Sequence, residues 1–166
     1  MDSLPRYSTR LVNMTNLNPT LIEELYAKKY NASVTTRKDI GDFYPEGIGA
    51  VNVKSNNLDK SNYSPNLGSA DRLFNHLNTG KSLKYLFVDY RGDSIVNERL
   101  VDAHHISWDC LTIQCQGKGV IQMKSALKVD KNQTKEQFLK GFSPAYKVYL
   151  DKERLKLDKL EAKYCN

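Results

Sequence analysis

The segment AVNVKSNN, residues 50–57, decides how the fold is interpreted, because its apolar, β-branched run ends at a lysine flanked by an amide and a hydroxyl. Valine and polar residues alternate through Val51, Asn52, Val53 and Lys54, which is the period of a half-buried β-strand. Residues two apart on a strand share a face, so we expect Asn52 and Lys54 to point the same way. The segment therefore predicts a strand that presents an amide and an ammonium together.

Two aspartates lie shortly before this strand. Asp39 and Asp42 lie in the stretch DIGDFY, which a turn-forming Pro-Glu-Gly sequence separates from the strand. This order predicts two antiparallel strands joined by a turn. A carboxylate on the first strand could then meet Asn52 and Lys54 at one edge of the sheet.

Turn and cap residues divide the rest of the chain into further elements. Asn18-Pro19 ahead of an amphipathic run predicts the start of a helix, because asparagine caps helices and proline suits the first helical turn. The other expected elements are a helix in 69–80 that begins near Ser69 and ends at Gly80, a strand at 83–90 that pairs with 94–103, a hairpin in 110–125, and helices from 134 onward. This order predicts an α/β or α+β fold around a mainly antiparallel or mixed sheet.

The composition is that of an ordinary globular protein. The chain has 166 residues, 40% of them hydrophobic, which suits a single domain with its own core. A net charge of +6 favours a polyanionic partner such as nucleic acid, because neutralised phosphates release their counterions. Three cysteines without paired metal-ligand spacing predict reduced thiols in the cytoplasm. No apolar run approaches the ~20 residues that span a membrane, so no membrane partner is expected.

Asp39, Asp42 and Lys54 are residue types that suit phosphodiester hydrolysis. Mg²⁺ prefers oxygen ligands, which a carboxylate, an amide or backbone oxygen, and water can supply. A nearby ammonium can orient or help deprotonate the attacking water and can offset charge on the phosphate. The same residue types on a hairpin also make an ordinary solvated face, and spacing alone leaves both interpretations open.

Three blocks of sequence resemble the PD-(D/E)xK nucleases, and most closely the type II restriction endonucleases of the HincII/HpaI kind. The first runs from Asp39-Ile40 to VNVKS, the second is KSNYSPNLGSA at 60–70, and the third is ISW at 106–108 followed by Ile113-Gln114. The second block is similar to the family's K-S-x-x-x-P-N-x-x-S-A, and its distance from the D-x-K motif carries the resemblance. The likeness covers most of the chain and implies a restriction-endonuclease-like mixed sheet flanked by helices.

The resemblance implies roles for the residues of the first block. Lys54 is the catalytic lysine, and Asp39 is the carboxylate that binds Mg²⁺, because the unbroken match keeps the Asp-Ile pair and its spacing together. Asp42 is the competing ligand, since a shorter turn between the two strands would place it where Asp39 otherwise lies.

Asn52 departs from the family pattern, which has an acidic second metal ligand at this position. An amide oxygen can coordinate Mg²⁺ but brings no charge. Three interpretations are open: the enzyme tolerates the amide and still cuts, an introduced Asp→Asn change traps a bound complex, or the chain is a naturally weakened relative that binds DNA without cutting.

The resemblance also implies which residues contact DNA. Asparagine suits a base edge because its amide presents a donor and an acceptor together. Tyr63 lies where the family can push a side chain between base pairs. The expected DNA-binding residues are Lys60 on phosphate, Asn62, Tyr63 and Asn66 in the polar segment 55–66, and His105 and Ser107 in a second segment. Asn66 could instead simply cap the helix expected to follow it.

These expectations combine into a Mg²⁺-dependent, sequence-specific endonuclease of double-stranded DNA with no organic cofactor. It would act as a homodimer, because protein symmetry mirrors the symmetry of a palindromic site. We expect a single domain, with a helical lead-in over 1–38, a catalytic and recognition core over 39–128 and helices over 134–166. A cytoplasmic location in a prokaryote, or an intracellular viral protein, follows. The alternatives are a DNA-binding protein with a disabled nuclease fold and a structure-selective nuclease such as a junction resolvase.

Overall fold

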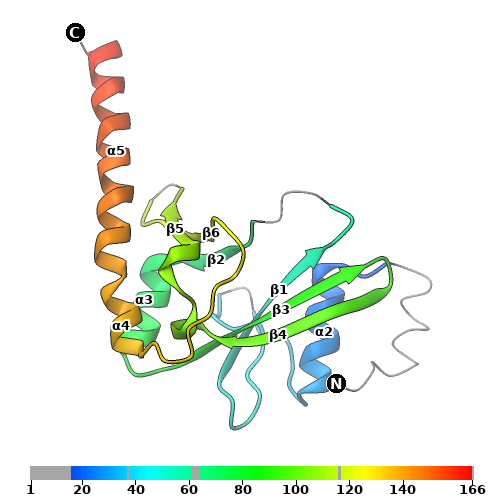
Figure 1. The fold of residues 1–166 in the computed structure, drawn as a ribbon. Coiled ribbons are helices and arrows are strands. Elements are labelled where there is room, and N and C mark those ends of the chain that lie inside the picture. Colours follow the sequence, from blue (N-terminus) through cyan, green and yellow to red (C-terminus); the bar gives the residue numbers. More distant parts are fainter. Residues whose placement is uncertain (1–15, 37, 61–63, 116, 166) are drawn as a thin grey trace. The chain divides into compact units, whose positions relative to one another are not determined.

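The computed structural model describes residues 16–36, 38–60, 64–115 and 117–165. In chain order its elements are α2 (Pro19–Lys29), β1 (Ala50–Asn57), β2 (Asn66–Ser69), α3 (Ala70–Asn78), β3 (Leu83–Arg91), β4 (Ser94–Asp102), the short 3₁₀ helices η1 (Ala103–His105) and η2 (Trp108–Cys110), β5 (Leu111–Gln114), β6 (Val120–Met123), α4 (Lys135–Lys140) and α5 (Phe142–Tyr164). The fold is therefore of the mixed α+β class, as the sequence predicts (Figure 1).

The described residues form two compact units, each assembled from two segments of the chain. The first unit comprises the described parts of 1–63 and 82–103, and the second comprises those of 64–81 and 104–166. Each unit has its own three-stranded sheet, β1-β3-β4 in the first and β2-β6-β5 in the second. Both units draw residues from the region 39–128 that we expected to form the catalytic and recognition core.

The sheet of the first unit is mixed. β1 runs parallel to β3, with Lys54 opposite Phe87, and β3 pairs antiparallel with β4. The pairing of 83–90 with 94–103 is confirmed. The strand expected at residues 39–44 is not formed: only Phe43 makes an antiparallel bridge, to Val51.

Helix α2 begins as the sequence predicts. The Oδ1 atom of Asn18 accepts a hydrogen bond of 2.9 Å from the backbone N–H of Leu21, and Pro19 occupies the first helical turn. Lys28 and Lys29 lie in the last turn, where positive charge is favourable beside the free carbonyl groups.

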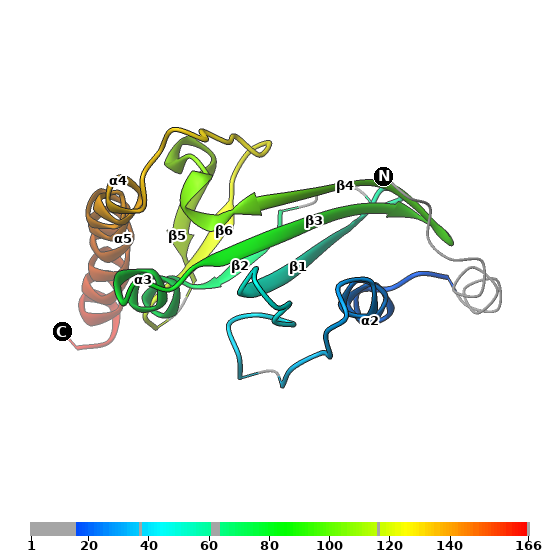
Figure 2. The same ribbon diagram turned by 90° about the horizontal axis from the view of Figure 1, so that it is seen from below.

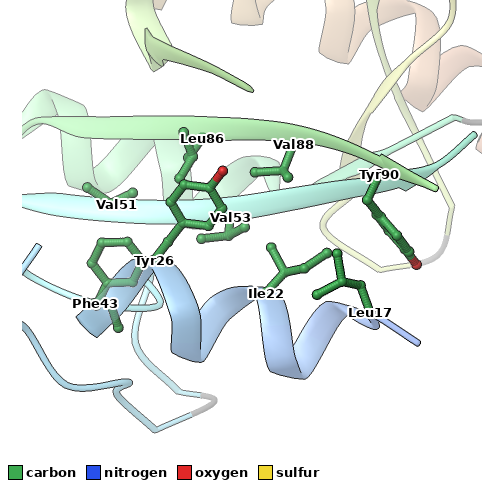
Figure 3. Close-up of a cluster of buried hydrophobic side chains, with 10 residues drawn as sticks. Leu17, Ile22, Tyr26, Phe43, Val51, Val53, Leu86, Val88 and Tyr90 are labelled. Carbon is green, nitrogen blue, oxygen red and sulfur yellow. The ribbon is translucent and has the colours of Figure 1, made fainter. Parts of the chain in front are cut away.

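The helix α2 covers one face of the β1-β3-β4 sheet (Figure 2). Ile22 and Tyr26 are fully buried and point toward Val51 and Val53 of β1 and the neighbouring strand β3 (Figure 3). Burying such side chains contributes roughly 1.5–3 kcal/mol each. Because Val51 and Val53 take this buried face, the alternation of the strand leaves Asn52 and Lys54 on its other side.

The second unit contains an antiparallel sheet with helices packed beside it. β5 and β6 form the expected hairpin, with Leu111 opposite Met123, and β2 pairs with β6. The helix α3 is capped by Ser69, whose side chain accepts from the backbone N–H of Arg72, and Gly80 follows with φ +87°. Asn66 is therefore not a helix cap: it begins β2, and the helix starts four residues later.

The helical C-terminal region is also confirmed. Thr134 and Gln137 form a reciprocal capping box at the start of α4. At the junction with α5, Gly141 lies so close to the indole ring of Trp108 that a Cβ atom there would overlap it. Trp108 stacks on Phe138 at a centroid distance of 5.4 Å and donates its indole N–H to the Phe138 carbonyl. None of the described helices is both long and apolar enough to cross a membrane.

Candidate active site

The candidate site lies at the edge of β1 that does not pair with β3. The backbone N–H of Asp42 donates to the Val51 carbonyl at 2.7 Å, and its carboxylate Oδ2 accepts from the backbone N–H of Val53 at 2.6 Å. The Asp42 carboxylate thus accepts the hydrogen bond that a backbone carbonyl would accept if residues 39–44 continued to pair with β1 as a strand. This explains why residues 39–44 form a single bridge instead of a strand, and it fixes the Asp42 carboxylate beside the segment from Asn52 to Lys54.

The Asn52 side chain is held in one orientation. Its Nδ2 atom donates to the Ile40 carbonyl at 3.0 Å, which directs the amide oxygen away from that carbonyl. The Oδ1 atom is buried, and no hydrogen-bond donor among the described residues reaches it. A buried acceptor without a partner costs roughly 1–3 kcal/mol. The site therefore holds an amide oxygen that is fixed in position and that no donor among the described residues engages.

Burial lowers the pKa of the Lys54 ammonium, and the negative charges of Asp42 and Glu23 oppose this shift. Burial favours the uncharged amine because a charged group loses its hydration in the protein interior. An amine of lowered pKa can accept a proton at a pH where an exposed lysine cannot.

Burial raises the pKa of the Asp42 carboxyl, while the hydrogen bond from Val53 and the charge of Lys54 lower it. The direction of the net shift shows that desolvation outweighs both favourable interactions. Asp42 and Lys54 are therefore a half-buried pair whose charges depend on each other, which is common in functional sites and also occurs in structural ion pairs.

Glu23 is a residue of this site that the sequence did not reveal. It lies on α2 directly after the buried Ile22, and its charge acts on Lys54. The sequence showed only one acid among others in TLIEELY, because the neighbour of Glu23 is 31 residues away along the chain. The electrostatic effect of Glu23 on Lys54 arises only in the folded chain, where α2 packs on β1.

Asp39, the preferred metal ligand from the sequence, lies in the loop before β1 and is exposed. Its backbone N–H donates to the Thr36 carbonyl at 3.1 Å. The carboxylate contact with β1 that the structure gives is made by Asp42, three residues later. Asp42 is accordingly the better candidate for the carboxylate of the site.

The oxygen atoms of this site fit a hard divalent cation that retains water and substrate ligands. Mg²⁺ is usually bound through one or two carboxylates, with water and phosphate oxygens completing the shell. Here the protein offers the Asp42 carboxylate and the partnerless Asn52 oxygen. Within the described ranges there is no cluster of three or more His, Cys, Asp or Glu side chains that could enclose a metal.

The residues expected to contact bases have local partners in the second unit. The Asn66 Oδ1 atom accepts from the backbone N–H of Gly68 at 2.7 Å, and Ser107 accepts from that of Asp109 at 3.2 Å. His105 lies in η1, and its ring centroid is 4.3 Å from that of His104. Ser107 serves in this way as the N-cap of η2.

The remaining expected DNA contacts are Lys60, Asn62 and Tyr63 within the polar segment 55–66. Lys60 is exposed, and its backbone N–H donates to the Asn57 carbonyl at 3.0 Å. Asn62 and Tyr63 lie outside the residues that the structure describes.

No protein-family model matches this chain, and no curated protein matches it either.

Proposed function

We propose that this protein is a Mg²⁺-dependent endonuclease that hydrolyses phosphodiester bonds in double-stranded DNA at specific sequences. The observation that carries the proposal is the meeting of an acidic side chain, a partnerless amide oxygen and a half-buried lysine at the free edge of β1. The net charge of +6 supports a polyanionic substrate. The resemblance of the sequence blocks to the PD-(D/E)xK nucleases supports the same reaction.

In this proposal Asp42 and Asn52 are the residues that would hold a Mg²⁺ ion through their side-chain oxygens. When bound, the ion polarises a phosphate oxygen and lowers the pKa of a coordinated water. The hydrogen bond from the Val53 N–H to Oδ2 holds the Asp42 carboxylate in one orientation. Ile40 keeps the Asn52 amide oriented with its oxygen free.

In this proposal Lys54 is the general base that accepts the proton of the attacking water. Burial lowers the pKa of Lys54, so a fraction of the protein molecules carries this side chain as an uncharged amine. The amine can take a proton from the attacking water. The ammonium so formed then offsets negative charge on the phosphate. Asp42 and Glu23 favour this charged form and thereby limit how far the pKa falls.

Digestion of a sequenced plasmid tests the proposal. We expect discrete fragments with Mg²⁺ and none with EDTA, and mapping the fragment ends would give the recognition site. Lys54→Ala should abolish cleavage while specific binding stays within about tenfold, or ~1.4 kcal/mol. Lys152→Ala, which changes an exposed lysine of α5, is the matched control and should cut normally. Full cleavage by Lys54→Ala would refute the assignment.

A second candidate function is DNA binding without cleavage, and the identity of residue 52 favours it. An amide in place of a carboxylate removes one negative charge from the ion's surroundings and weakens metal binding. A gel shift with intact DNA in the presence of Mg²⁺ would support this function over the first. Cleavage that appears only in Asn52→Asp would identify the amide as its cause.

A further inference from the structure

The face of the β1-β3-β4 sheet that lies opposite α2 carries a row of aligned side chains. The register places Lys54 of β1 opposite Phe87 of β3, and Phe87 opposite Arg99 of β4. Residues directly opposite one another on neighbouring strands share a face of the sheet. Val53 and Leu86, the residues just before Lys54 and Phe87, take the face toward α2 (Figure 3). The alternation of the strands therefore puts the row on the other face.

Arg99 is the exposed end of this row. Among the described residues, no carboxylate lies within ion-pair distance of its guanidinium. Other basic residues of the same sheet are paired: Lys84 binds Asp102 at 2.6 Å, and Arg91 binds Asp59 at 3.1 Å. The planar fork of N–H donors on Arg99 is thus left to bind an anion from outside this unit, and phosphate matches its geometry.

The two adjacent rows of the same face carry no basic residue. They consist of Asn52, Tyr85 and Val101 on one side, and of Asn56, Asp89 and Asn97 on the other. The Asp89 carboxylate accepts a hydrogen bond of 3.1 Å from the Asn56 amide. Its negative charge disfavours a phosphate at that row. Of these rows, the one with Lys54 and Arg99 is therefore the one suited to a polyanion.

We propose that one strand of the DNA crosses β1, β3 and β4 along this row, with the scissile phosphate beside Lys54 and a second phosphate of the same strand bound by Arg99. The inference rests on the proposed function, which places the cleaved bond at Lys54. Neighbouring strands of a sheet lie about 4.8 Å apart, so about 10 Å separates the backbones of the two residues. Phosphates of one DNA strand recur about every 3.4 Å along the duplex axis, so the second phosphate lies within about three nucleotides of the cleaved bond.

Arg99 is a positioning residue in this arrangement. A phosphate contact fixes the register of the DNA on the protein and carries no sequence information of its own. Phe87, half-buried between the two cations, brings no charge and keeps them apart, so Arg99 does not share the phosphate at Lys54. Arg99 therefore holds the strand in place while the groups around Lys54 act on the bond.

The salt dependence of DNA binding tests the contact. Each phosphate bound on a duplex contributes about 0.9 to the slope of the logarithm of affinity against the logarithm of salt concentration. In EDTA, which prevents cleavage, Arg99→Gln should reduce this slope by about 0.9 and lower the affinity at about 0.1 M salt by up to about tenfold. Arg99→Lys keeps the charge and should keep the slope. Fluorescence anisotropy of a labelled duplex measures all three proteins.

Lys28→Gln is the matched control, because it removes the same charge from the opposite side of the sheet. Lys28 is exposed on α2, which covers the other face (Figure 2). We expect its slope to equal that of the wild type. An unchanged slope in Arg99→Gln, or an equal decrease in both variants, would overturn the proposal, because either result would leave net charge as the sole influence.

Cleavage kinetics separate this inference from the nuclease function. Arg99→Gln should raise KM by about tenfold and leave kcat within about twofold, because the contact is the same in the ground state and in the transition state. A fall in kcat at unchanged KM would exclude the positioning role. If the wild type binds DNA and shows the expected slope change but does not cut, the surface is supported and the nuclease function alone fails. A wild type that does not bind DNA would overturn both.

Discussion

The Asp42 carboxylate caps the backbone N–H of Val53, at 2.6 Å, on the strand residue that separates Asn52 from Lys54. This single contact does two things. It ends the ladder between residues 39–44 and β1, and it places a carboxylate next to the two polar side chains that the strand carries. A local structural role and a proposed chemical role therefore coincide in one side chain.

The first prediction separates Asp42 from Asp39. Asp42→Asn keeps an acceptor for the Val53 N–H but removes the charge, so we expect a folded protein whose cleavage falls by about 10²-fold or more. Asp39→Asn is the control, and because Asp39 is exposed in the loop we expect near-normal cleavage. Initial rates of plasmid cleavage measure both. Loss of activity in Asp39→Asn alone would reverse the assignment.

The second prediction concerns Asn52. In Asn52→Asp a carboxylate oxygen replaces the Nδ2 donor and faces the Ile40 carbonyl, so we expect a loss of about 1–3 kcal/mol in unfolding free energy without metal. Mg²⁺ should recover about 2.7 kcal/mol when its concentration is 100 times the dissociation constant. Thermal melts with and without Mg²⁺ measure this. Asn52→Ala, which offers no oxygen, should show no greater response to Mg²⁺ than the wild type.

The third prediction is a pH dependence caused by Lys54. Its pKa is lowered in the folded protein relative to 10.5, so between the two values the unfolded chain binds more protons and stability rises with pH. We expect the unfolding free energy of the wild type, minus that of Lys54→Met, to increase from neutral pH toward pH 10.5, by at most about 1.4 kcal/mol per pH unit. Urea denaturation at several pH values measures this difference. A difference that falls over this range would contradict the burial of the ammonium.

The fourth prediction concerns Glu23 and uses Glu24 as its control. The charge of Glu23 raises the pKa of Lys54, so Glu23→Gln should lower that pKa further. Glu24 is exposed on the same helix, and Glu24→Gln should leave the Lys54 titration unchanged. NMR titration of the ¹³C-methylated lysine measures both variants. An equal shift in the two would mean that a general change in net charge, and not the position of Glu23, is responsible.

The fifth prediction concerns the packing of the second unit. A Cβ atom at Gly141 would overlap the Trp108 ring, while the backbone there, at φ −68°, accommodates any residue. Gly141→Ala should therefore cost about 1–3 kcal/mol through overpacking alone. Trp108 is the only tryptophan of the chain, so its fluorescence reports the unfolding transition directly. Ser143→Ala, at an exposed position of α5, should leave the transition within about 0.5 kcal/mol.

Elements whose ends are set by neighbouring residues were predictable from the sequence. Asn18, Ser69 and Thr134 each cap a helix with their own side chain, and these bonds form within three residues of the chain. The hairpin of β5 and β6 and the pairing of β3 with β4 follow from short connections for the same reason. The expected strand at 39–44 failed because the Asp42 side chain competes with the backbone for the Val53 N–H, which no propensity describes.

Local sequence signals indicate where the helices and the hairpin begin and end and that Asn52 and Lys54 lie on one side of a strand, and the composition gives the positive charge of the chain. Three features depend on contacts between distant segments: β1 runs parallel to β3, Asp42 is the carboxylate beside β1, and Glu23 acts on Lys54. The difference lies in how far apart along the chain the interacting groups are. Caps and turns act over a few residues, whereas burial, pKa shifts and the lack of a partner for Asn52 arise from groups that only folding brings together.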